Sequence, residues 1–227
     1  MIVVVFLLIV VAIFYAPQWW VNYVFKKHSR ELEGMPGTGG ELAKHLLEKF
    51  ELSDVTVEEC EPRSDHYSPS DNAVRLSPDN FNGKSLTAIA IAAHEVGHAI
   101  QFNRKEPVSY LRSRYMSSAI RIKRVAIAIF MIMPLVTAVF HVPQLSLATI
   151  GAGLVAFFIS IMMYVAILPE EFDASFNKAL PILDKGDYVP KTYLPAIEEI
   201  LKAAAFTYVA GALADVLRLW RWIRFLR

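Results

Sequence analysis

Three long runs without charge stand out in the pattern of apolar and polar positions along the chain. Residues 2–25 contain no Lys, Arg, Asp or Glu, and residues 125–140 and 145–168 repeat this pattern. About 20 consecutive apolar residues are enough for a helix to cross a bilayer. We therefore predict a first membrane span within residues 1–25 and a hairpin of two further spans over residues 125–168.

The first uncharged run favours an uncleaved span over a cleaved signal peptide. A signal peptide begins with basic residues and ends at a small-residue cleavage site. No Lys or Arg precedes this run, and no A-x-A site follows it. Trp19, Trp20 and Tyr23 lie where an aromatic belt at the membrane interface is expected.

Basic residues flank the predicted spans on one side only. They follow the first span, crowd the start of the second and occupy the C-terminal end, whereas residues 141–144 carry none. Cytoplasmic loops of membrane proteins hold such an excess of Lys and Arg. The pattern predicts a multi-pass protein of the inner cell membrane, with its N-terminus outside and residues 26–124 and 169–227 in the cytoplasm.

The final stretch, residues 203–226, resembles a fourth span but is interrupted. It is uncharged until Asp215, and arginines then alternate with Trp, Leu, Ile and Phe. A basic helix with aromatic residues lies on a membrane surface more often than it crosses the membrane. We expect a packed helix whose end becomes interfacial.

The polar region between the first and second spans shows clear helix and strand signals. Thr38 and Glu41 form a capping box that begins a helix. Ser85 can cap a second helix over residues 86–102. Alternating residues predict short strands at 55–59 and 72–76, and residues 62–72 are rich in turn formers, which predicts a loop.

The overall composition removes several classes of protein. Of the 227 residues, 55% are hydrophobic and 20% charged, and the mean hydropathy is +0.37. This apolar content excludes an intrinsically disordered chain. A single cysteine, Cys60, excludes a scaffold of internal disulfides. The net charge of +1 argues against a nucleic-acid partner, because such proteins carry a strong basic excess.

Candidate chemistry lies in the helix predicted over residues 86–102, which contains an H-E-x-x-H motif at His94, Glu95 and His98. Residues four apart lie on one side of a helix, so both imidazoles can bind one Zn²⁺ ion. Glu95 is offset by one residue and can act as general base on the attacking water. The alternative is two buried histidines with partners of their own, but polar groups on an apolar helix are costly to bury without a function.

A catalytic zinc site needs a third protein ligand and one open position. No third histidine follows His98 at a metal-binding spacing, so the ligand must come from elsewhere. Glu170, Glu171 and Asp173 begin a helix directly after the predicted hairpin, which returns the chain to the side of the motif. Acidic residues in a first turn also simply stabilise a helix, so the residues alone leave the ligand open.

Six segments that together cover most of the chain form a specific combination: TGGELAKHLL, SDHYSP, VRLSP, IAAHEVGHAIQ, LPEEFDAS and AAAFTYVAGAL. With them the chain resembles the YugP-type bacterial membrane zinc metallopeptidases. The resemblance implies that Glu171 is the third ligand. Asp173 and Ser175 then fall where a carboxylate that supports the ligands is expected, and Glu170 stands where the family usually has an apolar residue.

The resemblance implies a metalloendopeptidase that hydrolyses peptide bonds with one Zn²⁺ ion. His94, His98 and Glu171 would bind the ion. Glu95 would take the proton of the attacking water and pass it to the leaving amine. The expected partners are the lipid bilayer and a protein or peptide substrate, with membrane proteins among the candidates.

The same resemblance indicates how substrate and oxyanion are held. Tyr208 and His66 are candidate donors to the oxyanion, although either side chain could be structural. In similar zincins an exposed strand edge beside the helix pairs with extended substrate. Residues 72–77 are the candidate for that edge.

The predicted fold class is a mainly α integral membrane protein with a small α+β, zincin-like cytoplasmic domain. Its parts are a first span (1–25), the zincin-like domain (26–124), a transmembrane hairpin (125–168) and a cytoplasmic helical segment with the third ligand and the interfacial tail (169–227).

Two other functions stay open. An intramembrane protease would carry the motif inside a span, but the apolar run between Lys84 and Arg104 is too short for that. A membrane adaptor or quality-control protein could hold zinc as a structural or non-proteolytic brace. Structural zinc sites usually have four protein ligands, often cysteines, and the sequence shows no evident fourth ligand.

Overall fold

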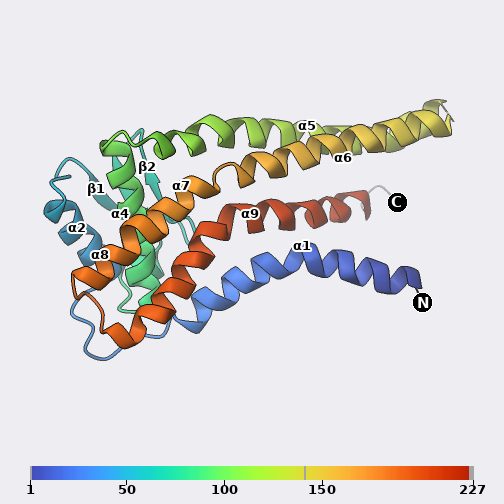
Figure 1. Cartoon of the computed structure of the whole chain (residues 1–227). Coiled ribbons are helices and arrows are strands. Elements are labelled where there is room, and N and C mark those ends of the chain that lie inside the picture. Colours follow the sequence, from blue (N-terminus) through green and yellow to red (C-terminus); the bar gives the residue numbers. More distant parts are fainter. Residues whose placement is uncertain (1, 141, 225–227) are drawn as a thin grey trace. The chain divides into compact units, whose positions relative to one another are not determined.

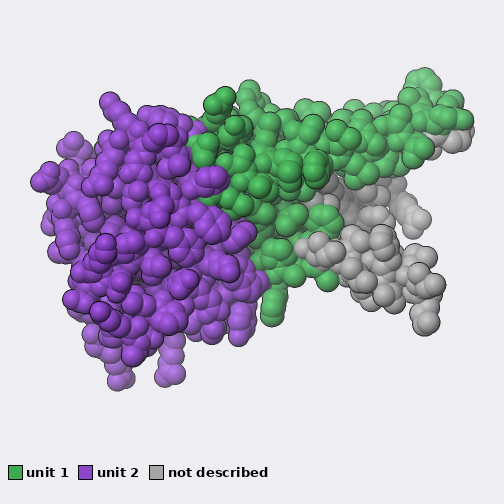
Figure 2. Space-filling model, viewed as in Figure 1, with its two compact units in different colours: residues 1–19, 111–168, 207–227 green, residues 20–110, 169–206 purple. Residues whose placement is uncertain are grey.

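The computed structural model describes residues 2–140 and 142–224, and it is mostly helical with one small three-stranded sheet (Figure 1). The chain divides into two compact units, which Figure 2 colours separately. The sheet unit comprises residues 20–110 and 169–206, and the hairpin unit comprises residues 1–19, 111–168 and 207–227. The expectation of a mainly helical chain with a small sheet is confirmed.

Three short strands form the sheet: β1 (Thr56–Glu59), β2 (His66–Ser68) and β3 (Ala73–Leu76). Their order is β1-β3-β2. β1 runs parallel to β3, with Val57 opposite Val74, and β2 runs antiparallel, with Tyr67 also opposite Val74. β1 and β3 lie where alternating residues predict strands.

Two details of the sheet differ from the prediction. Residues 62–72, predicted to be a loop, contain β2, because a strand of three residues between turns is too short to show alternation. Residues 72–77, predicted to be an exposed edge, contain β3, which is the central strand and is paired on both sides. The proposal of a substrate-binding edge at 72–77 is therefore wrong, and β2 is an edge strand instead.

Helix α2 (Gly39–Lys49) begins at the predicted capping box. The Thr38 N–H donates to Glu41 Oε2 at 2.8 Å, and the Glu41 N–H donates to Thr38 Oγ1 at 3.2 Å. These bonds satisfy two of the N–H groups that a first turn leaves without partners. Leu42 and Leu46 lie buried on one face of this helix.

Helix α4 (Leu86–Asn103) follows the short helix α3 (Pro78–Phe81). Ser85 Oγ accepts the N–H of Ala88 at 3.1 Å and caps α4 as predicted. Every residue of α4 through Gln101 is buried. The helix that carries the H-E-x-x-H motif is therefore covered by protein.

Short helical segments complete the chain around α4. They are η1 (Pro107–Tyr110), α7 (Leu168–Phe172), η2 (Asp173–Ala179), α8 (Leu180–Lys185), η3 (Lys191–Tyr193) and the first turns of α9 (Leu194–Arg224). Segment η2 is a π-helix, in which backbone hydrogen bonds join residues five apart. A Cβ atom at Gly97 would lie 2.8 Å from the carbonyl oxygen of Ala174, so this glycine allows α4 and η2 to approach closely.

Helices α5 (Leu111–Phe140) and α6 (Pro143–Val165) form a hairpin within the hairpin unit and run side by side (Figure 1). Large apolar side chains are exposed along both helices. Those more than half exposed include Val125, Ile132, Leu135, Val139, Leu147, Leu154, Val155 and Phe158. Large exposed apolar patches are typical of surfaces that contact a membrane or another protein.

One helical run in the part of the chain that the structure describes, Leu147–Lys185, is long and apolar enough to cross a membrane. The first predicted span lies in α1 (Ile2–Lys27). Multi-pass topology and its orientation stay predictions. The side chains of residues 215–227, which include the predicted interfacial tail, lie outside the described residues.

Candidate metal centre

Helix α4 brings two imidazoles together in its middle. His94 and His98 lie four residues apart, and their ring centroids are 4.7 Å apart. The side chains are only 5% and 2% exposed. Buried imidazoles need polar partners, because an unpaired polar group in an apolar environment costs free energy.

Glu171 of α7 completes a cluster of three metal-binding groups. Its Oε2 atom lies 3.3 Å from Nε2 of His94 and 3.3 Å from Nε2 of His98. Ligand-type atoms of all three buried residues lie within 4.8 Å of one another. Ligand atoms about 2.05 Å from a tetrahedral Zn²⁺ ion would lie roughly 3.3 Å apart, and both distances from Glu171 Oε2 to the imidazoles match this spacing.

The charge on Glu171 also fits a bound cation. Its Oε1 atom is buried and has no hydrogen-bond partner among the described residues. Burial raises the pKa of the Glu171 carboxyl, but positive charge on the adjacent His98 and His94 outweighs burial and lowers the pKa well below its usual value. A metal ion in the same place would act in the same direction. The Glu171 carboxyl is therefore deprotonated, whether the positive charge beside it is on the histidines or on a metal ion.

Ser175 of η2 forms a hydrogen bond with Nδ1 of His94, the ring nitrogen that does not face Glu171. The Ser175 Oγ atom lies 3.0 Å from His94 Nδ1 and 3.1 Å from the Leu201 carbonyl oxygen of α9. The hydroxyl has one proton and a carbonyl only accepts, so Ser175 donates to Leu201 and accepts from the His94 Nδ1–H. In a neutral His94 the lone pair is then on Nε2, which lies beside Glu171.

Gln101 forms the corresponding hydrogen bond with His98, whose Nδ1 atom lies 3.0 Å from Gln101 Oε1. When both rings are neutral, their Nε2 atoms present lone pairs to the Glu171 carboxylate at 3.3 Å, whereas protonated rings would donate to it. Three acceptor atoms that face one another without a proton repel, and a cation between them removes the repulsion. The donor set of two imidazole nitrogens and one carboxylate oxygen is one that Zn²⁺ prefers.

Glu95 lies outside this cluster and contacts the sheet. Its side chain is buried, and Oε2 accepts a hydrogen bond from the backbone N–H of Tyr67 in β2 at 2.8 Å. This bond fixes one carboxylate oxygen and ties α4 to an edge strand. Glu95 is next to His94 in the sequence but is not one of the three clustered residues, and its role as a general base stays a prediction.

The other two acidic candidates for the third ligand occupy different positions. Glu170 Oε1 lies 4.0 Å from His98 Nδ1, the nitrogen that faces Gln101. Asp173 accepts hydrogen bonds from Gln101, Asn177 and Lys178. Burial raises the pKa of Asp173, but these bonds outweigh burial and lower it below its usual value. Of the three carboxylates that the sequence offers as candidates for the third ligand, Glu171 is the one in the cluster.

The two candidate oxyanion donors lie in different units. His66 belongs to β2, and its Nδ1 atom lies 2.6 Å from the Ser64 carbonyl oxygen. It precedes Tyr67, whose N–H binds Glu95. Tyr208 belongs to the hairpin unit, where its hydroxyl accepts a hydrogen bond from Arg112 at 3.1 Å. The catalytic roles of His66 and Tyr208 stay predictions.

Gln101 and the Tyr67 amide contact the site residues although neither was predicted to do so. Gln101 carried a usable signal: it lies three residues after His98 on the same side of the helix, in an otherwise apolar stretch. The Tyr67 amide carried none, because any residue supplies a backbone N–H.

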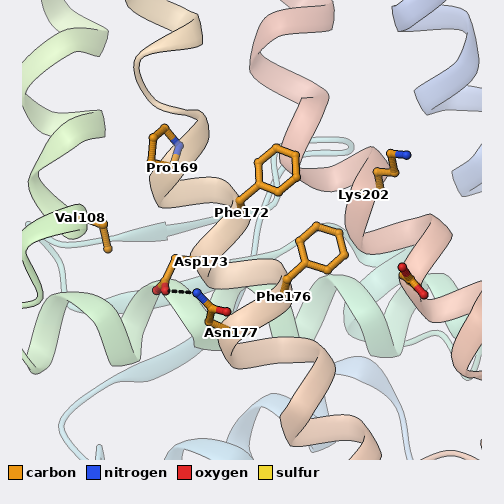
Figure 3. A pocket seen from close by; sticks show the side chains of 8 residues that line it. Val108, Pro169, Phe172, Asp173, Phe176, Asn177 and Lys202 are labelled. Carbon is orange, nitrogen blue, oxygen red and sulfur yellow. Dashed lines mark hydrogen bonds between the residues drawn. The ribbon is translucent and has the colours of Figure 1, made fainter.

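An open pocket of about 600 Å³ lies along α7 and η2 (Figure 3). Its lining comprises Val108, Pro169, Phe172, Asp173, Phe176, Asn177, Glu198 and Lys202. None of the three clustered residues lines it. Asp173 connects the two places, because it lines the pocket and also binds Gln101.

Comparison with known proteins agrees with this geometry. The buried histidine–histidine–carboxylate cluster fits a zinc site. The chain belongs to the family described as "Putative neutral zinc metallopeptidase", whose model matches residues 2–227. A relative from Bacillus subtilis (strain 168), named "Putative membrane protease YugP", is 32% identical over 207 residues, which cover 91% of this chain and 88% of the relative. No solved structure matches the chain significantly.

Proposed function

We propose that this protein is a membrane-bound, zinc-dependent metalloendopeptidase. The observation that carries the proposal is the close approach of His94 Nε2, His98 Nε2 and Glu171 Oε2, which all belong to buried residues. Membership in a zinc peptidase family supports the same reading. Protein or peptide chains are the proposed substrates.

His94, His98 and Glu171 would hold a single zinc ion. Bound zinc polarises a substrate carbonyl and lowers the pKa of the water bound to it to about 7. Three protein ligands leave a fourth position open, which a catalytic site needs and a structural site lacks. The described residues offer no fourth His, Cys, Asp or Glu to the cluster, and this favours a peptidase over a structural brace.

Glu95 would serve as the general base. The Tyr67 N–H holds Oε2 in place, so Oε1 is the oxygen that would take a proton from the attacking water. The same carboxyl would then give that proton to the leaving amine. His66, next to Tyr67 on β2, and Tyr208 are the proposed donors to the oxyanion.

The hairpin unit would anchor the enzyme in the inner membrane. The exposed apolar side chains of α5 and α6 suit contact with lipid. The relative's name includes the word membrane. By the distribution of basic residues, we propose that the N-terminus lies outside and that residues 26–124 and 169–227 are cytoplasmic.

Three variants of the purified full-length chain test the peptidase function. Glu95→Gln should keep its zinc and lose casein cleavage by roughly 10²- to 10⁴-fold, because proton transfer is removed while the ligands stay. Glu171→Gln should lose zinc as well as cleavage. Glu33→Gln, the same change at an exposed glutamate, should alter neither property.

Zinc content and cleavage rate are measured on the same preparations. Cleavage by Glu95→Gln at the parent rate would overturn the general-base role. Full zinc content in Glu171→Gln would overturn the ligand set. A parent protein that holds zinc but cleaves neither casein nor peptides would favour the membrane adaptor.

A further inference from the structure

Gln101 is a fully buried polar residue on an apolar helix. Its exposed fraction is 0%, and its side chain lies between His98 and the segment that carries Glu171. A buried amide has one acceptor and two donor positions to satisfy, and each unsatisfied position is costly. All three have partners, so the orientation of the amide can be worked out.

The amide of Gln101 can point in only one direction. Its Nε2 atom lies 2.9 Å from the Glu170 carbonyl oxygen and 2.8 Å from Asp173 Oδ2. Both partners are acceptors, so the NH₂ group must face them and use both of its protons. Oε1 therefore faces His98, and it can only accept.

We propose that Gln101 is a positioning residue that keeps the proton of neutral His98 on Nδ1 and so keeps Nε2 free for zinc. The inference rests on the proposed zinc site and adds the means by which one ligand is prepared. A flipped amide would present a donor to Nδ1, which would move the proton of a neutral ring to Nε2 and prevent metal binding.

A chain of charged groups supports this orientation. Asp173 Oδ2 accepts from Gln101 and also from Lys178 Nζ at 3.0 Å, and the same Nζ donates to Glu106 at 2.9 Å. Asn177 donates to the other oxygen, Oδ1, on the pocket side (Figure 3). Lys178 balances the charge of Asp173, so the acceptor that orients Gln101 stays in place.

Variants at positions 101 and 173 test the inference. Gln101→Leu removes the acceptor that faces His98 Nδ1, and it should weaken zinc binding roughly 10- to 100-fold. Asp173→Asn keeps an amide oxygen for Gln101 and should cost much less. Gln101→Glu combined with Asp173→Asn moves the negative charge from 173 to 101, restores a donor between them and keeps an acceptor for His98, so this double variant should bind zinc nearly as well as the parent.

Zinc affinity is measured by competition with a chelator, and melting is followed with and without zinc. Asn177→Ala is the control, because Asn177 binds Asp173 without contacting Gln101. It should leave zinc affinity within about threefold of the parent.

A purely structural role for Gln101 predicts a different pattern. The single Gln101→Leu variant would then melt lower without metal, yet it would keep the parent zinc affinity. That result, or a double variant that binds zinc no better than Gln101→Leu, would overturn the inference. If Glu171→Gln also bound zinc normally, the proposed zinc site would fail instead.

Discussion

The Nδ1 atoms of the two clustered imidazoles form hydrogen bonds with different chemical groups. Ser175 accepts from His94 through a hydroxyl whose proton goes to the Leu201 carbonyl, whereas Gln101 accepts from His98 through an amide oxygen. A hydroxyl can rotate and exchange its roles, while the amide cannot reverse without losing two bonds. His94 therefore depends on the carbonyl of α9 for its tautomer.

Removal of the Ser175 hydroxyl tests this dependence. Ser175→Ala should weaken zinc binding roughly 10- to 100-fold, because His94 loses the acceptor that keeps its proton on Nδ1. Ser160→Ala is a matched change, since Ser160 is also buried and also donates to a carbonyl, that of Ala119 in the hairpin unit. Chelator competition should show parent affinity for Ser160→Ala. Equal losses in both variants would contradict the role given to Ser175.

At the scale of residues, the sequence predicts the histidines better than their surroundings. The spacing of His94 and His98 is a local pattern, and a helix places residues four apart next to each other on one side. The third ligand depends on a contact between residues 73 positions apart, so the residues alone left Glu170, Glu171 and Asp173 equivalent. The resemblance to a family pointed to Glu171, which is the one found beside the imidazoles.

The π-helix η2 is the element that gathers the supporting groups. Glu171 lies two residues before it, in α7, and Asp173 and Ser175 lie within it. Glu171 and Ser175 both reach α4, Glu171 at the two Nε2 atoms and Ser175 at Nδ1 of His94. π-Helical turns are common at functional sites, and here η2 supports His94 through Ser175 and His98 through the bond from Gln101 to Asp173.

The close approach of α4 and η2 gives a prediction for Gly97. In Gly97→Ala the new Cβ atom would lie 2.8 Å from the Ala174 carbonyl oxygen, so η2 must move away. We expect a loss of about 1–3 kcal/mol in the free energy of unfolding and weaker zinc binding, because Glu171 and Ser175 move with that segment. Thermal melting and chelator competition measure the two effects.

Gly151→Ala provides the comparison, because a Cβ atom there meets nothing within 4 Å. A helix generally gains up to about 1 kcal/mol when glycine becomes alanine, so this variant should be unchanged or slightly more stable. Parent zinc affinity in Gly97→Ala would show that the helix spacing does not set the site.

At the scale of elements, the sequence predicts the helix starts that are fixed by local hydrogen bonds. The caps at Thr38 and Ser85 fix the starts of α2 and α4, and both appear as expected. β2 and η2 have no such signal. β2 owes its place to pairing with β3 and to the bond between Tyr67 and Glu95, and the π-helix forms where contacts with α4 and α9 hold its side chains.

At the scale of the whole molecule, most of the large apolar side chains that are exposed among the described residues lie in one unit. The hairpin unit exposes leucine, valine and phenylalanine side chains along α5 and α6, while the sheet unit buries its apolar residues around α4. This division supports the proposed contact of the hairpin unit with lipid. It leaves the direction of insertion to be measured.

Labelling of single cysteines measures that direction. In a Cys60→Ser background, Val142→Cys at the predicted outer turn should react with a membrane-impermeant maleimide in intact cells. Glu33→Cys should react only after the cells are opened, because its loop is predicted to be cytoplasmic. Both positions are exposed, so access depends on the membrane alone. The reverse pattern would contradict the proposed orientation.

The order of the ligands along the chain has a consequence for biosynthesis. His94 and His98 precede the hairpin, and Glu171 follows it directly. A ribosome that has made everything up to Leu168 has therefore produced both imidazoles but not the carboxylate between them. The three-residue cluster therefore cannot form on a growing chain until the hairpin has been synthesised. Under the proposed function, a fragment that ends within the hairpin lacks the third ligand and would have no peptidase activity.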